Sequence, residues 1–272
     1  MRKLVQAFYL RAPNESLMAK LPKQYQFTDL SDYGRFIARR IASALKNTSI
    51  TPIHITTWFI VSGLLAILCI LNNYFVFAAF FLILKSILDA ADGELSRLKN
   101  TPSYVGRYYD SIADIILNFL FLLTIWYIND SSLLLMILAF IGIQLQGTLY
   151  NYYYVILRNN VDGDTTSRIF EDHTPTAFKG ETQQAVNIFY KIYNFLYIPF
   201  DKVIYLMDRD AMHSKNFPGW FMTLLSTFGL GFQLLVIALL LVLHLESYVI
   251  PFFIVYSFFI FVFISIRRWS LN

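Results

Sequence analysis

Six long apolar segments constrain the fold of this chain more than any other feature. A helix of about 20 apolar residues spans the hydrocarbon core of a bilayer. The segments are 53–71, 74–90, 107–128, 131–156, 219–244 and 248–266. Apolar residues make up 57% of the chain and charged residues 15%, whereas soluble domains carry about 25% charged residues. The sequence therefore predicts an all-α integral membrane protein with six transmembrane helices.

The distribution of Lys and Arg predicts the orientation of these helices. The short connections at 72–73, 129–132 and 244–247 contain neither residue. Every basic residue lies in the N-terminal tail, near the connection between the second and third segments, in the connection between the fourth and fifth, or after the last segment. The positive-inside rule then places both termini on the cytoplasmic side, in a bacterium the inner face of the inner membrane. The net charge of +4 favours anionic lipid headgroups as the partner, and not nucleic acid. The single cysteine, Cys69, excludes an internal disulfide and a zinc site built on several thiolates.

Two pairs of aspartates lie where the second and third apolar segments meet. Asp89 and Asp92 are three residues apart, and Asp110 and Asp114 are four apart, so each pair shares one face of a helix. Four like charges at the edge of a membrane are destabilising unless a positive group lies among them. One or two divalent cations with hard oxygen ligands satisfy this requirement.

Lys85 lies one helical turn before Asp89. Two interpretations remain open for its ammonium group. It either neutralises the aspartates in the absence of metal or extends to the membrane interface while its stem stays in the apolar layer.

The spacing of these residues resembles the signature of the CDP-alcohol phosphotransferase (CDP-alcohol phosphatidyltransferase) family, class I. That signature is D-x2-D-G-x2-A-R-x8-G-x3-D-x3-D. The positions that match it are Asp89, Asp92, Gly93, Arg97, Gly106, Asp110 and Asp114. Ser96 stands where the family has alanine, and Ile53 replaces the asparagine of a P-N-x-x-T opening before the first span. The second departure puts a nucleotide contact at that position in doubt.

The resemblance implies an enzyme of phospholipid biosynthesis that transfers a substituted phosphate group from a CDP-linked substrate to an alcohol and releases CMP. By this analogy Asp89, Asp92, Asp110 and Asp114 hold Mg²⁺ or Mn²⁺, with two ions expected. Asp114 is also the expected general base. Arg97 is expected to contact the diphosphate, and Gly93, Ser96 and Gly106 to line the place of the CDP moiety. Family members are frequently homodimers, so a homodimer is an expectation here as well.

The substrates are less well defined. We expect CDP-diacylglycerol as donor and a polar alcohol as acceptor, but the same signature serves CDP-choline or CDP-ethanolamine with diacylglycerol as acceptor. A phosphorylated acceptor requires additional basic residues, and Arg158, Lys202 and Arg209 are candidates. Anchoring at the membrane surface explains each of these three equally well.

Three other classes of protein use membrane aspartates. A prenyltransferase also binds a diphosphate through magnesium, but its aspartate motifs lie in separate halves of the chain, whereas here both pairs fall within 26 residues. A divalent-cation transporter places its site near the bilayer midplane, often between repeated halves, and no such repeat is present. A purely structural cluster of ion pairs would need a basic residue for each acid, and too few basic residues lie near the four aspartates in the sequence.

The rest of the chain divides into a cytoplasmic tail, residues 1–50, and the six-helix domain, residues 51–272. Apolar residues at helical spacing after Ser31, interleaved with arginines, predict an amphipathic interfacial helix that Ser31 caps. The long connection 157–218 is predicted to be a loop followed, from Gln183, by a second interfacial helix with a kink at Pro199.

Overall fold

The computed structural model describes residues 21–161, 173–214 and 217–271, and within these ranges the regular structure is helical without strands. The α-helices are α2 (Arg35–Leu45), α3 (Pro52–Leu71), α4 (Phe75–Lys99), α5 (Tyr104–Asn129), α6 (Leu133–Asn160), α7 (Gln183–Met207), α8 (Gly219–Leu225), α9 (Leu230–Val242), α10 (Val249–Tyr256) and α11 (Phe259–Ser270). Single 3-10 turns complete the described structure: η3 (Lys23–Tyr25), η4 (Leu30–Asp32), η5 (Arg209–His213), η6 (Ser226–Phe228) and η7 (Glu246–Tyr248). The predicted all-α class is confirmed for the described residues.

Four helical segments are long and apolar enough to cross a membrane. They are α3, α5, α6 and the segment Glu246–Trp269, which contains α10 and α11. A fifth is obtained if Gly219–Phe228 and Leu230–Val242, which meet at an angle of 54°, count as one broken span. The six predicted spans therefore reduce to four or five by length and composition.

The remaining predicted span lies in α4. Its first ten residues are apolar, but Lys85, Asp89 and Asp92 follow within the same helix. The sequence predicted that this span ends at Ala90, whereas the helix continues to Lys99. The aspartates therefore lie inside α4 and not at its end.

Short polar residues close the connections between the helices. Asn73, Asn100, Asp130 and His244 all have positive φ, between 46° and 60°. Asn and Asp tolerate this left-handed conformation better than most residues because their short side chains bond to the local backbone. At the start of α3, Thr51 and His54 form a capping box, with Pro52 in the first turn. His54 thus has a structural role at the end of a helix.

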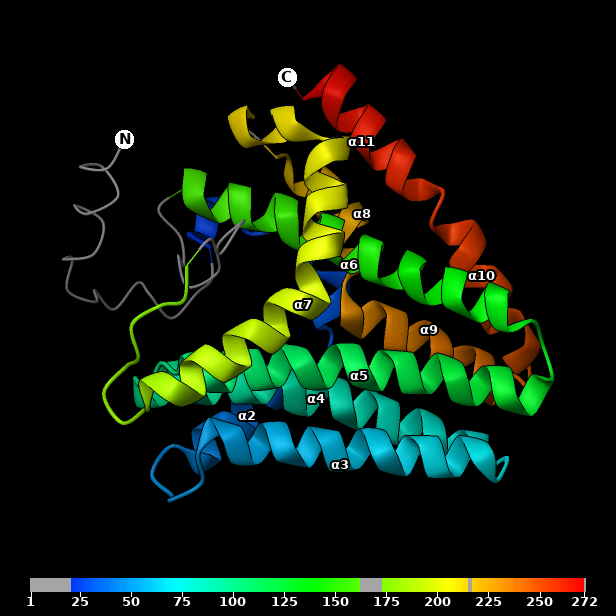
Figure 1. Ribbon diagram of the computed structural model, residues 1–272, viewed down its shortest axis with the longest axis horizontal. Helices are drawn as coiled ribbons and strands as arrows, with labels where there is room; N and C mark the ends of the chain where they lie inside the picture. The colour runs from blue at the N-terminus through cyan, green and yellow to red at the C-terminus, as the bar shows by residue number, and fades with distance from the viewer. Residues whose placement is uncertain (1–20, 162–172, 215–216, 272) are drawn as a thin grey trace.

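The main core forms around α4, which packs against α2, α3 and α9. Figure 1 shows α3, α4 and α5 running along the long axis of the molecule, with α7 crossing over α5. Close approach depends on small residues: a β-carbon on Gly63 would lie 2.8 Å from Leu117 of α5. Such contacts allow α3 to pack against both helices that carry the aspartates.

The prediction that Ser31 caps an amphipathic helix is wrong, because Ser31 lies within the turn η4 and α2 begins only at Arg35. Ser31 does not cap a helix there; its backbone N–H donates to Asp29, which caps the short turn η4. Gly229 and Gly231 admit this turn, because a β-carbon on Gly231 would lie 1.9 Å from the Ser31 carbonyl oxygen. In α2 itself Ala38 and Ala42 are buried, whereas Phe36 and Ile37 are exposed. Residues 1–20 of the predicted tail lie outside the described residues.

Gln144 and Gln146 lie among apolar residues of the segment 131–156, a position that predicts hydrogen bonds between helices. For Gln146 the prediction is confirmed: its amide donates to Ser257 Oγ at 2.9 Å, and its Oε1 accepts from Gln233 at 3.2 Å. For Gln144 it is wrong, because its buried Nε2 has no partner among the described residues.

The helix predicted from Gln183 is present as α7, with Pro199 in its interior. Figure 1 shows α7 changing direction along its length, first crossing α5 and then running beside α6. The loop predicted before it lies partly outside the described residues, at 162–172.

A buried ion pair joins the end of α7 to the end of the chain. Asp208 and Arg267 both have fully buried side chains, and Arg267 Nε donates to Asp208 Oδ2 at 2.8 Å. Tyr153 of α6 also donates its hydroxyl to Asp208. Arg267 and Arg268 follow the last apolar segment of the sequence directly, a position that predicts a cytoplasmic anchor for both. That prediction is wrong for Arg267, because its side chain is fully buried and its guanidinium pairs with Asp208 in the interior of the protein.

This pair predicts that Arg267→Met destabilises the fold strongly. Removing one partner leaves a buried charge uncompensated, which costs about 3–5 kcal/mol. The apparent Tm of the purified protein in detergent should fall by many degrees, and adding Asp208→Asn should restore part of the loss. Arg268→Met is the comparison: Arg268 Nε also lies 3.3 Å from Asp208 Oδ1, but its side chain is 49% exposed, so its loss should lower the apparent Tm less than the loss of the fully buried Arg267. Equal melting temperatures for the Arg267 and Arg268 variants would contradict the assignment.

Candidate active site

The connection between α4 and α5 determines where the aspartates lie. α4 ends with Asn100 in the left-handed conformation, and Ser96 Oγ donates to the Thr101 carbonyl oxygen at 3.1 Å. Pro102 follows, and Ser103 begins α5 by accepting from the Gly106 N–H at 2.8 Å. The chain thus reverses within a few residues, at the helix break that Pro102 and its polar neighbours predict in the sequence. Ser96, the departure from the family pattern, helps to close α4.

Three of the four predicted metal ligands come together in the structure. One carboxylate oxygen from each of Asp89, Asp92 and Asp110 lies within 4.8 Å of the others. Asp92 is buried, and its Oδ2 accepts a 2.7 Å hydrogen bond from Thr56 Oγ1 of α3. The buried Oδ1 of Asp110 has no hydrogen-bond partner among the described residues. An unsatisfied buried carboxylate oxygen beside two further carboxylates fits a hard divalent cation.

The fourth aspartate has a different partner. Asp114 Oδ1 forms an ion pair with Lys85 Nζ, which also lies 3.5 Å from Asp89 Oδ2. The Lys85 side chain is fully buried, and its ammonium lies 4.6 Å from the centre of the Phe59 ring. The structure therefore resolves the alternative left open by the sequence: Lys85 neutralises the aspartates and does not extend to the interface.

Arg97 and the two glycines lie beside this group. Arg97 folds back over Gly93, where a β-carbon would lie 3.6 Å from its Nη1. Its Nη2 is 3.3 Å from Glu94, and its buried Nε has no partner among the described residues. A β-carbon on Gly106 would lie 3.7 Å from Ile53 Cγ1, so the apolar replacement in the P-N-x-x-T opening packs next to this glycine.

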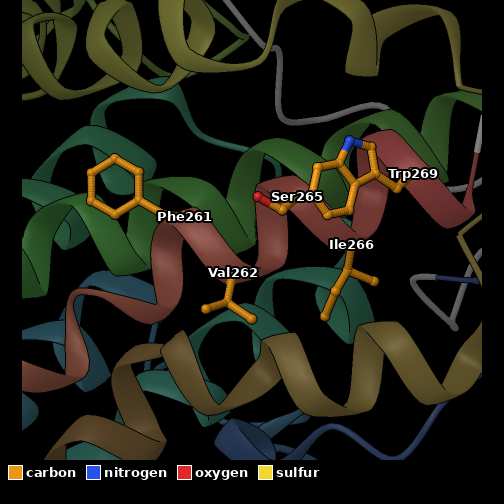
Figure 2. Close-up of a pocket in the computed structure, with 5 residues that line it drawn as sticks. All are labelled: Phe261, Val262, Ser265, Ile266 and Trp269. Atoms are coloured by element: carbon orange, nitrogen blue, oxygen red, sulfur yellow. The ribbon is translucent and has the colours of Figure 1, made fainter.

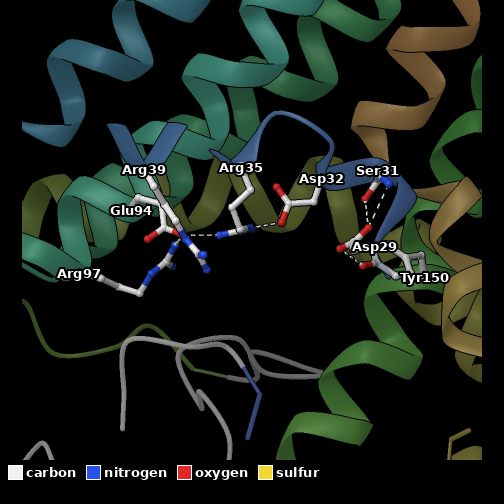
Figure 3. A network of polar contacts seen from close by, with 8 residues as sticks. All are labelled: Asp29, Ser31, Asp32, Arg35, Arg39, Glu94, Arg97 and Tyr150. Atoms are coloured by element: carbon white, nitrogen blue, oxygen red, sulfur yellow. Dashed lines mark hydrogen bonds and ion pairs between the residues drawn. The ribbon is translucent and has the colours of Figure 1, made fainter. Parts of the chain in front are cut away.

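Glu94 connects α2 to the predicted site, a role that the sequence did not indicate. It forms an ion pair with Arg35 and lies 3.6 Å from Arg39 Nε, both on α2. Figure 3 shows these arginines and Arg97 gathered around Glu94, with Asp32 on the other side of Arg35. The only signal in the sequence was the spacing of Glu94 and Arg97, three apart on one helix.

The long connection also contacts the start of α5, which the sequence did not predict. Glu181 Oε1 accepts from Ser103 Oγ at 2.7 Å and from the Val105 N–H at 2.8 Å. Further along, the Tyr197 hydroxyl of α7 donates to the carbonyl oxygen of Ser111 at 2.7 Å. Ser111 follows Asp110 directly, so α7 holds the turn of α5 that carries two predicted site residues.

A shallow pocket elsewhere in the molecule contains none of the predicted site residues. It lies on α11, and its lining residues are Phe261, Val262, Ser265, Ile266 and Trp269. The polar side-chain groups among them are the Ser265 hydroxyl and the indole N–H of Trp269 (Figure 2). It offers no charged group for a phosphate or a metal.

Comparison with known proteins agrees with the motif. The sequence model of the family described as CDP-alcohol phosphatidyltransferase matches residues 49–178, a range that contains α3 to α6 and all four aspartates. A search of curated proteins found no significant match. The resemblance inferred from the aspartate signature is therefore confirmed over this range. The chain carries a CDP-alcohol phosphatidyltransferase domain at residues 49–178.

Proposed function

We propose that this protein transfers the phosphatidyl group of CDP-diacylglycerol to the hydroxyl of a polar alcohol and releases CMP. The observation that carries the proposal is the convergence of Asp89, Asp92 and Asp110, with an unsatisfied carboxylate oxygen, inside the segment that matches the family. A membrane-embedded lipid donor and a water-soluble acceptor both reach a site at the membrane boundary. We place this boundary on the cytoplasmic side, with α4 as the additional span of a six-helix arrangement.

Asp89, Asp92 and Asp110 would hold Mg²⁺ or Mn²⁺. A divalent cation at this position polarises the phosphoryl oxygens and offsets the charge of the departing nucleotide. Arg97 supplies a further positive group, and its unpartnered Nε is a donor available to a diphosphate oxygen. Gly93 and Gly106 keep side chains away from the place that we assign to the CDP moiety, and Ser96 closes the end of α4 beneath it.

Asp114 is the proposed general base. The acceptor oxygen attacks the phosphorus that carries the diacylglycerol, the bond from this phosphorus to CMP breaks, and the hydroxyl proton passes to Asp114. Lys85 contacts Oδ1 of Asp114, which makes Oδ2 the oxygen that takes the proton. Little covalent chemistry is required of the protein, because phosphoryl transfer depends mainly on placement and electrostatics.

α7 contributes to this placement through Tyr197. Burial, together with the negative charge of Asp114, raises the pKa of Tyr197 well above its ordinary value. The hydroxyl therefore remains protonated at physiological pH and donates to Ser111. We propose that Tyr197 is a positioning residue that fixes the turn of α5 between Asp110 and Asp114.

The first prediction concerns the proposed metal ligands. Asp110→Asn should lower CMP release from CDP-diacylglycerol by about 100-fold or more, because even residues that only support a metal ligand are worth about 10–100-fold. The assay uses a panel of alcohols, with Mg²⁺ or Mn²⁺, and includes CDP-choline with diacylglycerol as the alternative substrate pair. Asp130→Asn is the control, since Asp130 lies at the opposite end of α5 in a left-handed turn that Asn also adopts. An Asp110 variant with full activity would refute the proposed site.

The second prediction concerns the base. Asp114→Asn should lower kcat while binding of CDP-diacylglycerol is retained, because the amide does not accept the hydroxyl proton. Substrate binding is measured directly by equilibrium titration, and turnover by CMP release. Full turnover in this variant would remove Asp114 from the mechanism.

The third prediction concerns α7. Tyr197→Phe removes one hydrogen bond worth about 0.5–1.5 kcal/mol, so activity should fall by about 2- to 10-fold. If the residue acts through α5, Mn²⁺ binding should weaken together with activity, while the apparent Tm changes little. Tyr127→Phe is the control, because Tyr127 lies on the same helix as the aspartates with an exposed side chain. A Tyr197 variant with unchanged Mn²⁺ affinity would show that the contact is structural only.

A further inference from the structure

Glu94 lies among three arginines beside the candidate site, and one of them, Arg97, belongs to the family signature. Arg97 Nη2 lies 3.3 Å from Glu94 Oε1. The same oxygen pairs with Arg35 and lies 3.6 Å from Arg39 Nε, both on α2, and the Glu94 side chain is only 9% exposed. Figure 3 shows the arginines gathered around this carboxylate. Glu94 is therefore held from α2 as well as by its own helix.

The direction of the Arg97 side chain depends on two neighbours in α4. Side chains of an α-helix tilt toward its N-terminus, which for Arg97 is the direction of Asp92. Gly93 leaves room for the guanidinium, because a β-carbon there would lie 3.6 Å from both Nη1 and Nη2. Glu94, three residues before Arg97, has the spacing of an ion pair on one helix. The guanidinium is thereby held about one turn closer to the aspartates than the Arg97 backbone.

Glu94 contacts only one edge of this guanidinium. Its partner is Nη2, whereas the buried Nε of Arg97 has no partner among the described residues. An unrestrained arginine side chain loses conformational entropy when a ligand orders it, so an arginine that the protein already restrains binds that ligand more tightly. The contact with Glu94 supplies such a restraint and leaves Nε available to a phosphate oxygen.

We propose that Glu94 is a positioning residue for diphosphate binding: it fixes the Arg97 guanidinium where it contacts the substrate, and Arg35 of α2 holds Glu94 in place. The inference rests on the diphosphate contact that the proposed function assigns to Arg97. Glu94 also has an opposing effect, because its negative charge repels a diphosphate. Restraint and repulsion predict opposite changes in affinity when the charge of Glu94 is removed, so an experiment separates them.

The test is a double-mutant cycle between Glu94 and Arg97. The probes are CDP and inorganic pyrophosphate, each titrated with saturating Mn²⁺ into the purified full-length protein in detergent, without an alcohol and therefore without turnover. Glu94→Gln should weaken the binding of both probes by about 5-fold, the upper range for a partly exposed ion pair. In an Arg97→Gln background the same substitution should change the affinity by less than about 2-fold, because no guanidinium remains to be positioned.

Arg40→Gln is the matched control. It removes a positive charge from α2, but the Arg40 guanidinium lies 4.2 Å from the centre of the Phe36 ring, and both residues are exposed. The affinity for both probes should remain that of the wild type. Tighter binding in Glu94→Gln would show that repulsion dominates and would overturn the inference. An equal loss of affinity in the Arg97→Gln background would also overturn it, because that result is expected if Glu94 only attaches α2 to α4.

A second variant keeps the inference testable if Glu94→Gln does not fold, which circular dichroism and gel filtration would show. Glu94→Asp retains the counter-charge of Arg35 but shortens the reach to Arg97, so it should weaken binding by about 2-fold or more in the presence of Arg97 only. Unchanged affinity in this variant, or a wild type that binds neither probe, would contradict the inference. A wild type that shows the expected cycle with pyrophosphate but releases no CMP from CDP-diacylglycerol would overturn the proposed function and leave the role of Glu94 intact.

Discussion

The need to compensate four carboxylates inside an apolar bundle governs the arrangement of this protein. Two of them belong to α4 and two to α5, helices that both pack against α3. Their mutual repulsion is offset from two directions: Lys85 reaches Asp89 and Asp114 from within α4, and Thr56 donates to Asp92 from α3. The oxygen that neither reaches, Oδ1 of Asp110, is the one left without a partner. Lys85 and Thr56 thus compensate only part of the negative charge of the four aspartates. The candidate metal site lies at the carboxylate oxygens that these two residues do not contact.

The elements around this centre act mainly by restraining the two helices that carry it. α2 contacts the last turns of α4 through Arg35 and Glu94, and α7 contacts α5 through Tyr197 and the Ser111 carbonyl. Glu181, which precedes α7, holds the first turn of α5. The contacts of Glu94 and Glu181 involve a charged carboxylate, and the contact of Tyr197 is a neutral hydrogen bond. Because such contacts are directional, they hold α4 and α5 in one position relative to α2 and α7.

Much of the fold could be predicted from local patterns, because apolar length, turn residues and proline act over a few residues. The end of α4 before Pro102, the start of α7 near Gln183 and the convergence of Asp89, Asp92 and Asp110 all follow from such spacing. Predictions failed for residues whose position depends on a partner far away in the sequence. Nothing near Arg267 in the sequence indicates that Asp208 will bury it, and Ser31 gives no sign that it will lie against Gly231 of α9. For Lys85 the sequence is compatible with two positions of the ammonium group. The contact with Asp114, which lies on another helix, distinguishes them and can be seen only in the folded structure.

The burial of Arg267 also bears on how the chain can be handled. The segment that matches the family ends before α7, yet the last helical turn of the chain is bonded to Asp208 at the end of α7. A fragment cut to the recognised domain, residues 49–178, would lack α7 and Asp208 altogether. A chain shortened at its carboxyl end would leave Asp208 without Arg267 and so loosen the end of α7, the helix that contacts the turn of α5 with the predicted site residues. A fusion partner should therefore be attached after Leu271, and α11 should be kept because it carries Arg267.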